Sequence, residues 1–251
     1  MSTGKPRVAI FDFACCEGCQ LQIVNMEEEI LDLIGAVDVV EWREALTESS
    51  HEYDIAIIEG SITRPEDEGR IELIRSRAKI LIALGACATI GGVNKLKNNF
   101  DLNEVKRCVY GKDANMPHLE TSMTKAVDEV VKVDYKVHGC PMDKKEFAYV
   151  ICCLLLGKKP EIPDYPVCVE CKMKENMCLW EVDEICLGPI IRAGCGARCP
   201  SSGFRCFGCR GYIDKPNVPA AKDVMDKHGL TVEQLKSKLV LFGSKQRPTE
   251  E

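Results

Sequence analysis

The sequence lacks several features that would indicate common classes of partner. It has no excess of basic residues: 39 Asp and Glu outnumber 33 Lys and Arg, which gives a net charge of -6. A nucleic acid is therefore not expected as the main partner, because binding phosphates calls for a basic surface. Long apolar runs are also missing, since the best one, "FAYVICCLLLG", has about half of the roughly 18–20 residues that span a bilayer. We expect no direct insertion into a membrane.

Targeting signals are absent from the first residues, "MSTGKPRVAIFDF", which contain no secretory pattern and no twin-arginine motif. We therefore expect the protein to be cytoplasmic, in a compartment where thiols stay reduced. The residue type in clear excess is cysteine, with 16 copies. In a reducing compartment, so many cysteines favour metal binding over disulfide bonds.

Five short runs rich in Val, Ile and Leu alternate with helical patterns in the first part of the chain. Such runs are typical of parallel strands that are buried on both faces and joined by helices. The runs cover residues 7–13, 37–42, 53–60, 79–86 and 132–139. We predict an α/β domain over residues 1–158, with a flavodoxin-like, doubly wound parallel sheet. No GxGxxG motif follows the first run, so NAD or FAD binding in this domain has little support.

The pattern changes after Gly157, where "KKPEIPDYP" contains three prolines and is typical of a linker. Eight cysteines follow between Cys168 and Cys209, with almost no regular apolar face. A segment of this kind buries too little surface to fold by packing alone, so metal cross-links are expected to hold it. We predict a second, small and irregular iron–sulfur domain over residues 159–251, which ends in a helical tail.

Four cysteines that are far apart in the sequence are expected to meet at one edge of the sheet. Each follows a predicted strand, and in open α/β sheets ligands bind beyond the carboxyl ends of the strands. The four are Cys16, Cys19, Cys87 and Cys140. This set fits either a 4Fe–4S cluster or a tetrahedral zinc ion. We favour iron–sulfur, because a doubly wound domain of this size needs no zinc ion to hold it together.

The second domain contains two further sets, each compact enough to bind one metal centre. One set is Cys168, Cys171, Cys178 and Cys186, and the other is Cys195, Cys199, Cys206 and Cys209. Spacing alone leaves zinc open for both sets. Three sets on one chain favour iron–sulfur clusters that pass single electrons, because zinc does not change its oxidation state.

Four cysteines remain outside these sets: Cys15, Cys108, Cys152 and Cys153. Cys152 and Cys153 lie in an apolar, helix-like stretch, and Cys108 has no partner nearby in the sequence, so we expect all three to be small core residues. Cys15 is expected to pack beside the first set without being a ligand.

Two acidic residues are expected at the same edge of the sheet as the first set. Glu17 lies between Cys16 and Cys19, and Glu59 ends the third predicted strand. A carboxylate at this place could relay protons, or it could accept N–H bonds from the turns. We favour the structural role for both residues.

Several motifs resemble the small, electron-transfer subunit of cytoplasmic nickel–iron hydrogenases. They are "CEGCQLQ", "IIEGSI", "LGACATIGG", "VDYKVHGCP", "YPVCVECK", "CLGPIIRAGCGARCP" and "CFGCRG", and the likeness runs from about residue 7 to residue 213. The resemblance implies three 4Fe–4S clusters. A proximal cluster is implied on the first set, a distal cluster on the set that begins at Cys168, and a medial cluster on the set that begins at Cys195.

The resemblance also implies partners. The Ni–Fe centre would lie in a separate large subunit, because no CxxC pairs remain for it in this chain, so this chain alone is not expected to make or split H₂. Electrons would leave to a subunit of flavin, ferredoxin-like or heterodisulfide-reductase type. NAD(P), a deazaflavin coenzyme, ferredoxin and heterodisulfide all remain open as acceptors.

Two alternatives remain. A complex I-like iron–sulfur subunit of the 20-kDa type, from a respiratory or membrane-bound oxidoreductase, shares the first domain but usually lacks the eight cysteines of the second. A non-redox scaffold that binds zinc is less favoured.

Overall fold

The computed structural model describes residues 4–111, 117, 120–215, 218–231, 234, 237–238 and 240–242. By its internal packing the chain divides into two units, Met1–Pro160 and Glu161–Glu251. None of the helices found within the described residues has the length and apolar character that a membrane span requires.

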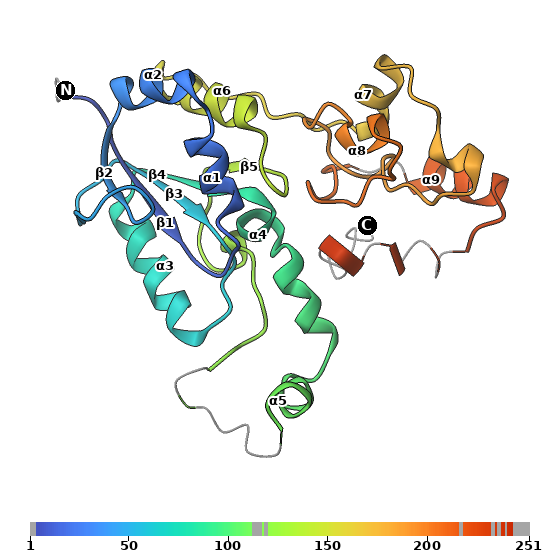
Figure 1. The fold of residues 1–251 in the computed structure, drawn as a ribbon, viewed down its shortest axis with the longest axis horizontal. Helices are drawn as coiled ribbons and strands as arrows, with labels where there is room; N and C mark the ends of the chain where they lie inside the picture. The colour runs from blue at the N-terminus through green and yellow to red at the C-terminus, as the bar shows by residue number, and fades with distance from the viewer. Residues whose placement is uncertain are drawn as a thin grey trace. The chain divides into compact units, whose positions relative to one another are not determined.

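The first unit is built on a five-stranded sheet whose strands are all parallel (Figure 1). The strands are β1 (Arg7–Asp12), β2 (Asp38–Trp42), β3 (Ile55–Glu59), β4 (Ile80–Leu84) and β5 (Tyr135–Val137). Their order in space is β2-β1-β3-β4-β5, which is the flavodoxin-like order. All five predicted strands and the predicted fold class are therefore confirmed.

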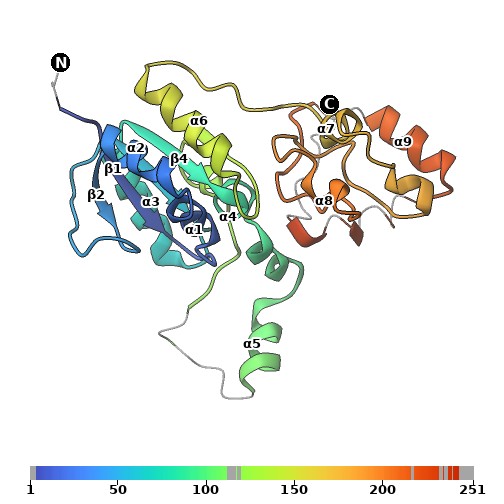
Figure 2. The same ribbon diagram turned by 45° about the horizontal axis from the view of Figure 1, so that its top comes forward.

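Helices cover both faces of this sheet (Figure 2). The helices of this unit are α1 (Gly18–Val24), α2 (Glu28–Ala36), α3 (Pro65–Arg77), α4 (Gly85–Ile90), α5 (Leu102–Tyr110) and α6 (Lys144–Leu155), with the 3-10 helices η1 (Val93–Asn99) and η2 (Val127–Glu129). Helix α5 does not cover the sheet and lies away from it in both Figure 1 and Figure 2. Some begin at clear capping residues. Asp143, for example, accepts hydrogen bonds from the N–H groups of Lys145 and Glu146 at the start of α6.

Alternate residues of each strand face opposite layers, as the pleat of a β-strand requires. On one face, Phe11 of β1 and Ile58 of β3 belong to a core cluster with Ile71 of α3. On the other face, Ile10 of β1 lines a small apolar pocket with Ile23 of α1 and residues of α2 and α6. Because every residue of β3 is buried, its sequence is continuously apolar up to Glu59 rather than alternating.

The second unit contains only short helices and isolated β-bridges among its described residues. The helices are α7 (Val167–Met173), η3 (Leu179–Val182), α8 (Arg198–Ser201), α9 (Val218–Lys227) and η4 (Val240–Phe242). Its buried core includes Trp180 and Leu187 together with two predicted ligands, Cys186 and Cys206. The cysteines of this unit thus form part of the packing itself.

Two of the cysteines predicted to be core residues are not buried. Cys108 on α5 and Cys152 on α6 are exposed, whereas Cys153 is buried as expected. Neighbouring residues on a helix point in directions about 100° apart, so an apolar helical stretch can bury one of two adjacent cysteines and expose the other. The prediction for Cys108 and Cys152 was wrong.

Candidate cluster-binding sites

The first candidate site lies where strands β1, β4 and β5 end. Cys16 precedes α1 and Cys19 lies within it, Cys87 lies in α4 directly after β4, and Cys140 follows β5 by three residues. Burial raises the pKa of the Cys87 thiol to about 12, and the neighbouring Cys140 and Cys16 thiols add to that rise. Burial and the Cys16 thiol likewise raise the pKa of Cys140. The structure therefore brings these predicted residues together at the carboxyl edge of the sheet.

The backbone approaches the sulfur atoms of this set so closely that side chains would not fit. A Cβ atom at Gly85 would clash with Sγ of Cys19, and one at Gly92 would lie 2.8 Å from Sγ of Cys87. Both glycines have a positive φ, which residues with a side chain rarely adopt. In addition, the N–H of Met142 donates to Sγ of Cys19 over 3.5 Å. Thiols with close backbone and N–H donors are the surroundings that an iron–sulfur cluster needs.

Cys15 lies beside the same set. The pKa of its thiol is raised to about 12, mainly by burial. The charge of Glu59 adds to this rise, and the Cys87 thiol adds to it more weakly. Its side chain is half-buried, whereas Cys16 and Cys140 are exposed.

Glu59 is a buried carboxylate at the end of β3, with 2% of its surface exposed. Its Oε1 accepts the N–H of Cys19 over 2.9 Å and its Oε2 accepts the N–H of Gln20 over 3.2 Å. These N–H groups belong to the first turn of α1, which has no other partner for them within the helix. Glu59 thus fixes the turn that carries Cys19, which is the arrangement that a structural role requires.

Glu17 has different surroundings. It adopts a left-handed backbone conformation with φ 60° before α1, and its carboxylate lies 3.5 Å from Arg43. A hydrogen bond to Glu44 is the main cause that raises the pKa of Glu17. Arg43 also donates to the Asp12 carboxylate over 2.8 Å. The two predicted acidic residues are therefore not equivalent, since one is buried and the other faces a surface group of charges.

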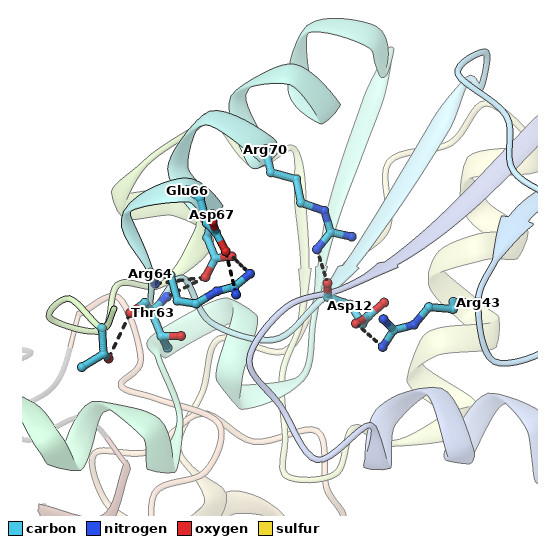
Figure 3. Close-up of polar contacts among 8 residues, drawn as sticks. Asp12, Arg43, Thr63, Arg64, Glu66, Asp67 and Arg70 are labelled. Atoms are coloured by element: carbon cyan, nitrogen blue, oxygen red, sulfur yellow. Dashed lines mark hydrogen bonds and ion pairs between the residues drawn. The ribbon is translucent and has the colours of Figure 1, made fainter. Parts of the chain in front are cut away.

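Arginines surround the end of β1 on this edge of the sheet (Figure 3). Arg70 of α3 donates to the carbonyl of Asp12 over 2.8 Å, and its guanidinium lies 4.5 Å from the centre of the Phe13 ring. Asp67 accepts the N–H groups of Thr63 and Arg64 at the start of α3. These contacts fix the loops after β1 and β3 against α3.

The second candidate site gathers Cys168, Cys171, Cys178 and Cys186 within the second unit. Burial raises the pKa of the Cys168 thiol to about 12, and the thiols of all three other members contribute to the rise. A Cβ atom at Gly188 would lie 3.1 Å from Sγ of Cys168 and 3.5 Å from Sγ of Cys186. As in the first set, glycine backbone lies directly against the sulfur atoms.

The third candidate site gathers Cys195, Cys199, Cys206 and Cys209. Burial and then the Cys195 thiol raise the pKa of Cys199. Burial is also the main cause that raises the pKa of Cys206, and the thiols of Cys186, Cys209 and Cys195 add to the rise, in that order. Among the described residues, no group of three or more His, Cys, Asp or Glu side chains has the spacing to hold a single metal ion.

The sequence analysis missed a carboxylate in the second unit. Glu170 lies between Cys168 and Cys171 on α7, and it accepts the N–H of Gly194 over 2.8 Å and the N–H of Ala197 over 3.1 Å. A signal was present in "CVEC", where an acidic residue stands between two cysteines as Glu17 does in "CEGC". Its partners, however, lie 24 and 27 residues further along the chain.

Comparisons with known proteins place these sites in context. Residues 16–154 match the family described as NADH ubiquinone oxidoreductase, 20 Kd subunit. The chain is 36% identical to the sulfhydrogenase 2 subunit delta of Pyrococcus furiosus, over 94% of this chain and 98% of that one. It is 33% identical to a vhu-type subunit of the F420-non-reducing hydrogenase of Methanocaldococcus jannaschii, over 86% of this chain and 85% of that one.

A solved structure is also similar. The structure of an NAD+-reducing [NiFe]-hydrogenase in the H2-reduced state includes a chain that superimposes with a TM-score of 0.59 and 27% sequence identity. The superposition covers 64% of this chain and 96% of that chain.

Proposed function

This chain belongs to the family of the 20-kDa NADH–ubiquinone oxidoreductase subunit and, within it, to the small subunits of [NiFe] hydrogenases; on that premise we propose that it conducts electrons through three 4Fe–4S clusters. One end of the path would meet a large subunit that holds the Ni–Fe centre, and the other end would meet an acceptor subunit. A bound 4Fe–4S cluster supplies a site that takes up and releases one electron at a time.

The observation that carries the proposal is that each predicted cysteine set has neighbouring thiols in the structure. In the first set, Cys87 has Cys16 and Cys140 as neighbours. The Cys140 thiol also raises the pKa of Cys19, so these two residues are neighbours as well. In the second unit, Cys168 has the other three members of its set as neighbours. Cys206 has Cys209 and Cys195 of its own set as neighbours, and also Cys186 of the other set. We assign the first set to a proximal cluster, the set of Cys168 to a distal cluster and the set of Cys195 to a medial cluster.

The exposed side of the first set supports a large subunit as the partner. Cys16 and Cys140 are exposed, and Leu21 and Val24 of the adjoining helix α1 are 49% and 46% exposed. A proximal cluster on these thiols would need a cover that excludes water, and permanent subunit interfaces commonly bury about 2,000 Å² or more. Docking of a large subunit on this face would supply that cover.

The acceptor subunit is proposed to be of flavin, ferredoxin-like or heterodisulfide-reductase type. The names of the similar proteins do not agree on one acceptor, since one enzyme is called NAD+-reducing and another is named only for not reducing F420. The complex I-like alternative depends on the first unit alone, because the family match ends at residue 154. The hydrogenase subunit of Pyrococcus furiosus, by contrast, matches 94% of the chain.

Metal analysis of the anaerobically purified chain tests this function. We expect about twelve iron atoms and a similar amount of acid-labile sulfide per chain, with electron paramagnetic resonance signals after reduction. Stoichiometric zinc without such signals would instead support the non-redox scaffold. The polypeptides that co-purify with the chain would identify the large subunit and the acceptor subunit.

A further inference from the structure

Helix α7 holds a loop that belongs to a different cysteine set. The helix carries Cys168 and Cys171, and between them Glu170 accepts hydrogen bonds from the N–H groups of Gly194 and Ala197, over 2.8 and 3.1 Å. Each oxygen of the carboxylate takes one of these bonds. The loop 194–197 contains Cys195 and leads directly into α8, which carries Cys199.

A lysine on the same helix side contacts this loop with the opposite charge. Lys174 follows Glu170 by four residues, a spacing that places two side chains on one side of a helix. Its Nζ donates to the carbonyl of Gly196 over 2.5 Å. The loop is thus held through two N–H groups by an anion and through one carbonyl by a cation. We call this pair of side chains the Glu170–Lys174 clamp.

The loop needs such external partners because its backbone is irregular. Gly194, Gly196 and Ala197 all have positive φ angles, of 106°, 61° and 47°. Ala197 is also fully buried, so its N–H has no access to water. The N–H groups of Gly194 and Ala197 both point at the Glu170 carboxylate, so the loop offers this anion two backbone donors. Charge-assisted hydrogen bonds of this kind are among the strong ones in proteins.

Further contacts join the same two cysteine sets. Asn176, just after α7, directs its Nδ2 both to Sγ of Cys171, at 3.7 Å, and to the hydroxyl of Ser201 on α8, at 3.0 Å. A side chain that contacts one predicted ligand therefore also contacts the helix that carries a ligand of the other set. The clamp is the charged part of this connection.

We propose that Glu170 is a positioning residue that, with Lys174, fixes the loop of Cys195 against the helix of Cys168 and Cys171 and tunes the potential of the clusters on both sets. The inference rests on the proposed function, since it needs clusters at these cysteines. A negative charge beside a cluster favours its oxidised form, so the Glu170 carboxylate lowers the reduction potential. Its hydrogen bonds also keep Cys195 in place while the set is being filled.

The test compares three variants of the full chain, reconstituted anaerobically with iron and sulfide. Glu170→Gln removes the charge and keeps one of the two acceptor oxygens, whereas Glu170→Ala removes the charge and both acceptors. Glu181→Gln is the matched control, because it removes the same charge from an exposed residue three positions after Cys178. The measurements are iron per chain and the midpoint potential of each cluster, followed by electron paramagnetic resonance during a redox titration.

The wild-type chain is measured first, and fewer than about twelve iron atoms per chain would overturn the proposed function itself and this inference with it. If the wild-type chain holds its full iron content, we expect Glu170→Gln to keep that content as well. Its two clusters in the second unit should have higher midpoint potentials, while the potential of the cluster in the first unit stays constant. Glu170→Ala is expected to lose about a third of the iron, corresponding to one cluster. Glu181→Gln should match the wild type. Unchanged potentials in Glu170→Gln would overturn the tuning of the clusters by Glu170. Full iron content in Glu170→Ala would overturn its positioning role, and either result would leave the proposed function intact.

Discussion

The backbone N–H of Cys206 donates a hydrogen bond to the sulfur of Cys186 over 3.2 Å. The two residues belong to different cysteine sets, and both are buried. The pKa of Cys186 reflects this contact, because burial raises it while the N–H groups of Cys206 and Gly188 oppose the rise. Hydrogen bonds to ligand sulfurs are one of the ways in which a protein sets a cluster potential. Two candidate sites in the second unit are therefore joined by a direct hydrogen bond between their cysteines.

Because of this hydrogen bond, we predict that a substitution in one set also changes the cluster of the other set. Cys186→Ser should lose about four iron atoms per chain, because its set then has only three thiols. It should also shift the potential of the remaining second-unit cluster, since the N–H of Cys206 loses its sulfur acceptor. Iron analysis and a redox titration followed by electron paramagnetic resonance measure both effects. Cys153→Ser, a buried cysteine outside the sets, is the control. Full iron content in Cys186→Ser would show that Cys186 is not a ligand.

The neighbouring cysteines Cys15 and Cys16 are expected to respond differently to substitution. Cys16→Ser should remove or convert the cluster of the first set, whereas Cys15→Ser should leave the iron content unchanged. The difference follows from the assignment of Cys16 as a ligand and Cys15 as a half-buried neighbour. Iron per chain, measured on the two variants in parallel, tests it. A loss of about four iron atoms in Cys15→Ser would reverse the assignment.

The sheet could be predicted from the sequence because its strands are buried on both faces. Ile55–Glu59 is apolar until its last residue, and such a run has few alternatives to a central parallel strand. The placement of Cys87 and Cys140 then follows from topology, since the ends of parallel strands meet at one edge. The orientation of side chains was harder to predict. The sequence indicated an apolar helix around Cys152, but it did not show that this residue faces outward.

The contacts of the second unit could not be predicted in the same way. Glu170 binds a loop that begins 24 residues later, and the loop geometry depends on left-handed residues such as Ala197. Few sequence patterns specify a backbone of this kind when no regular helix or strand sets the register. Spacing predicted a grouping of the cysteines but did not identify contacts such as those of Glu170, which hold the loop around Cys195.

Glu59 is expected to stabilise the loop of the first set. Glu59→Ala removes the acceptor for the N–H groups of Cys19 and Gln20, which then have no partner in a buried place. We expect the free energy of unfolding of the metal-free chain to fall by about 2 kcal/mol, measured by denaturant titration. Glu17→Ala is the control, because its carboxylate lies at the surface beside Arg43. An equal effect of both variants would contradict a specific structural role for Glu59.

Glu59 should also affect the reactivity of the thiols around it. Burial is the main cause that raises the pKa of Cys15 to about 12, and the Glu59 charge is the next largest. Glu59→Gln removes that charge, so the pKa of the Cys15 thiol should fall and its thiolate fraction at a given pH should rise. Alkylation rates of the metal-free chain, resolved by mass spectrometry of the modified peptide, measure this change. A slower reaction of Cys15 in the variant would contradict the expected sign.

The raised thiol pKa values also make the stability of the metal-free chain depend on alkaline pH. Burial raises the pKa of the Cys15 and Cys87 thiols, which both lie in the first unit, from 9.0 to about 12. Below about pH 9 these thiols are protonated in the folded and the unfolded chain, so their contribution to stability is fully present. As the pH rises toward about 12, the unfolded chain loses these protons first and the contribution is lost. We expect a lower denaturant midpoint at about pH 10 than at about pH 8.

Two variants make this pH effect specific to the buried thiols. Cys87→Ser removes one of them, so its midpoint should fall less between the two pH values than the midpoint of the wild type does. Cys152→Ser replaces an exposed cysteine and should keep the full wild-type fall. All samples need a chelator and a reductant, because a bound metal would hold the thiolates in the folded state and remove the effect. Equal falls in all three chains would show that other groups cause the pH dependence.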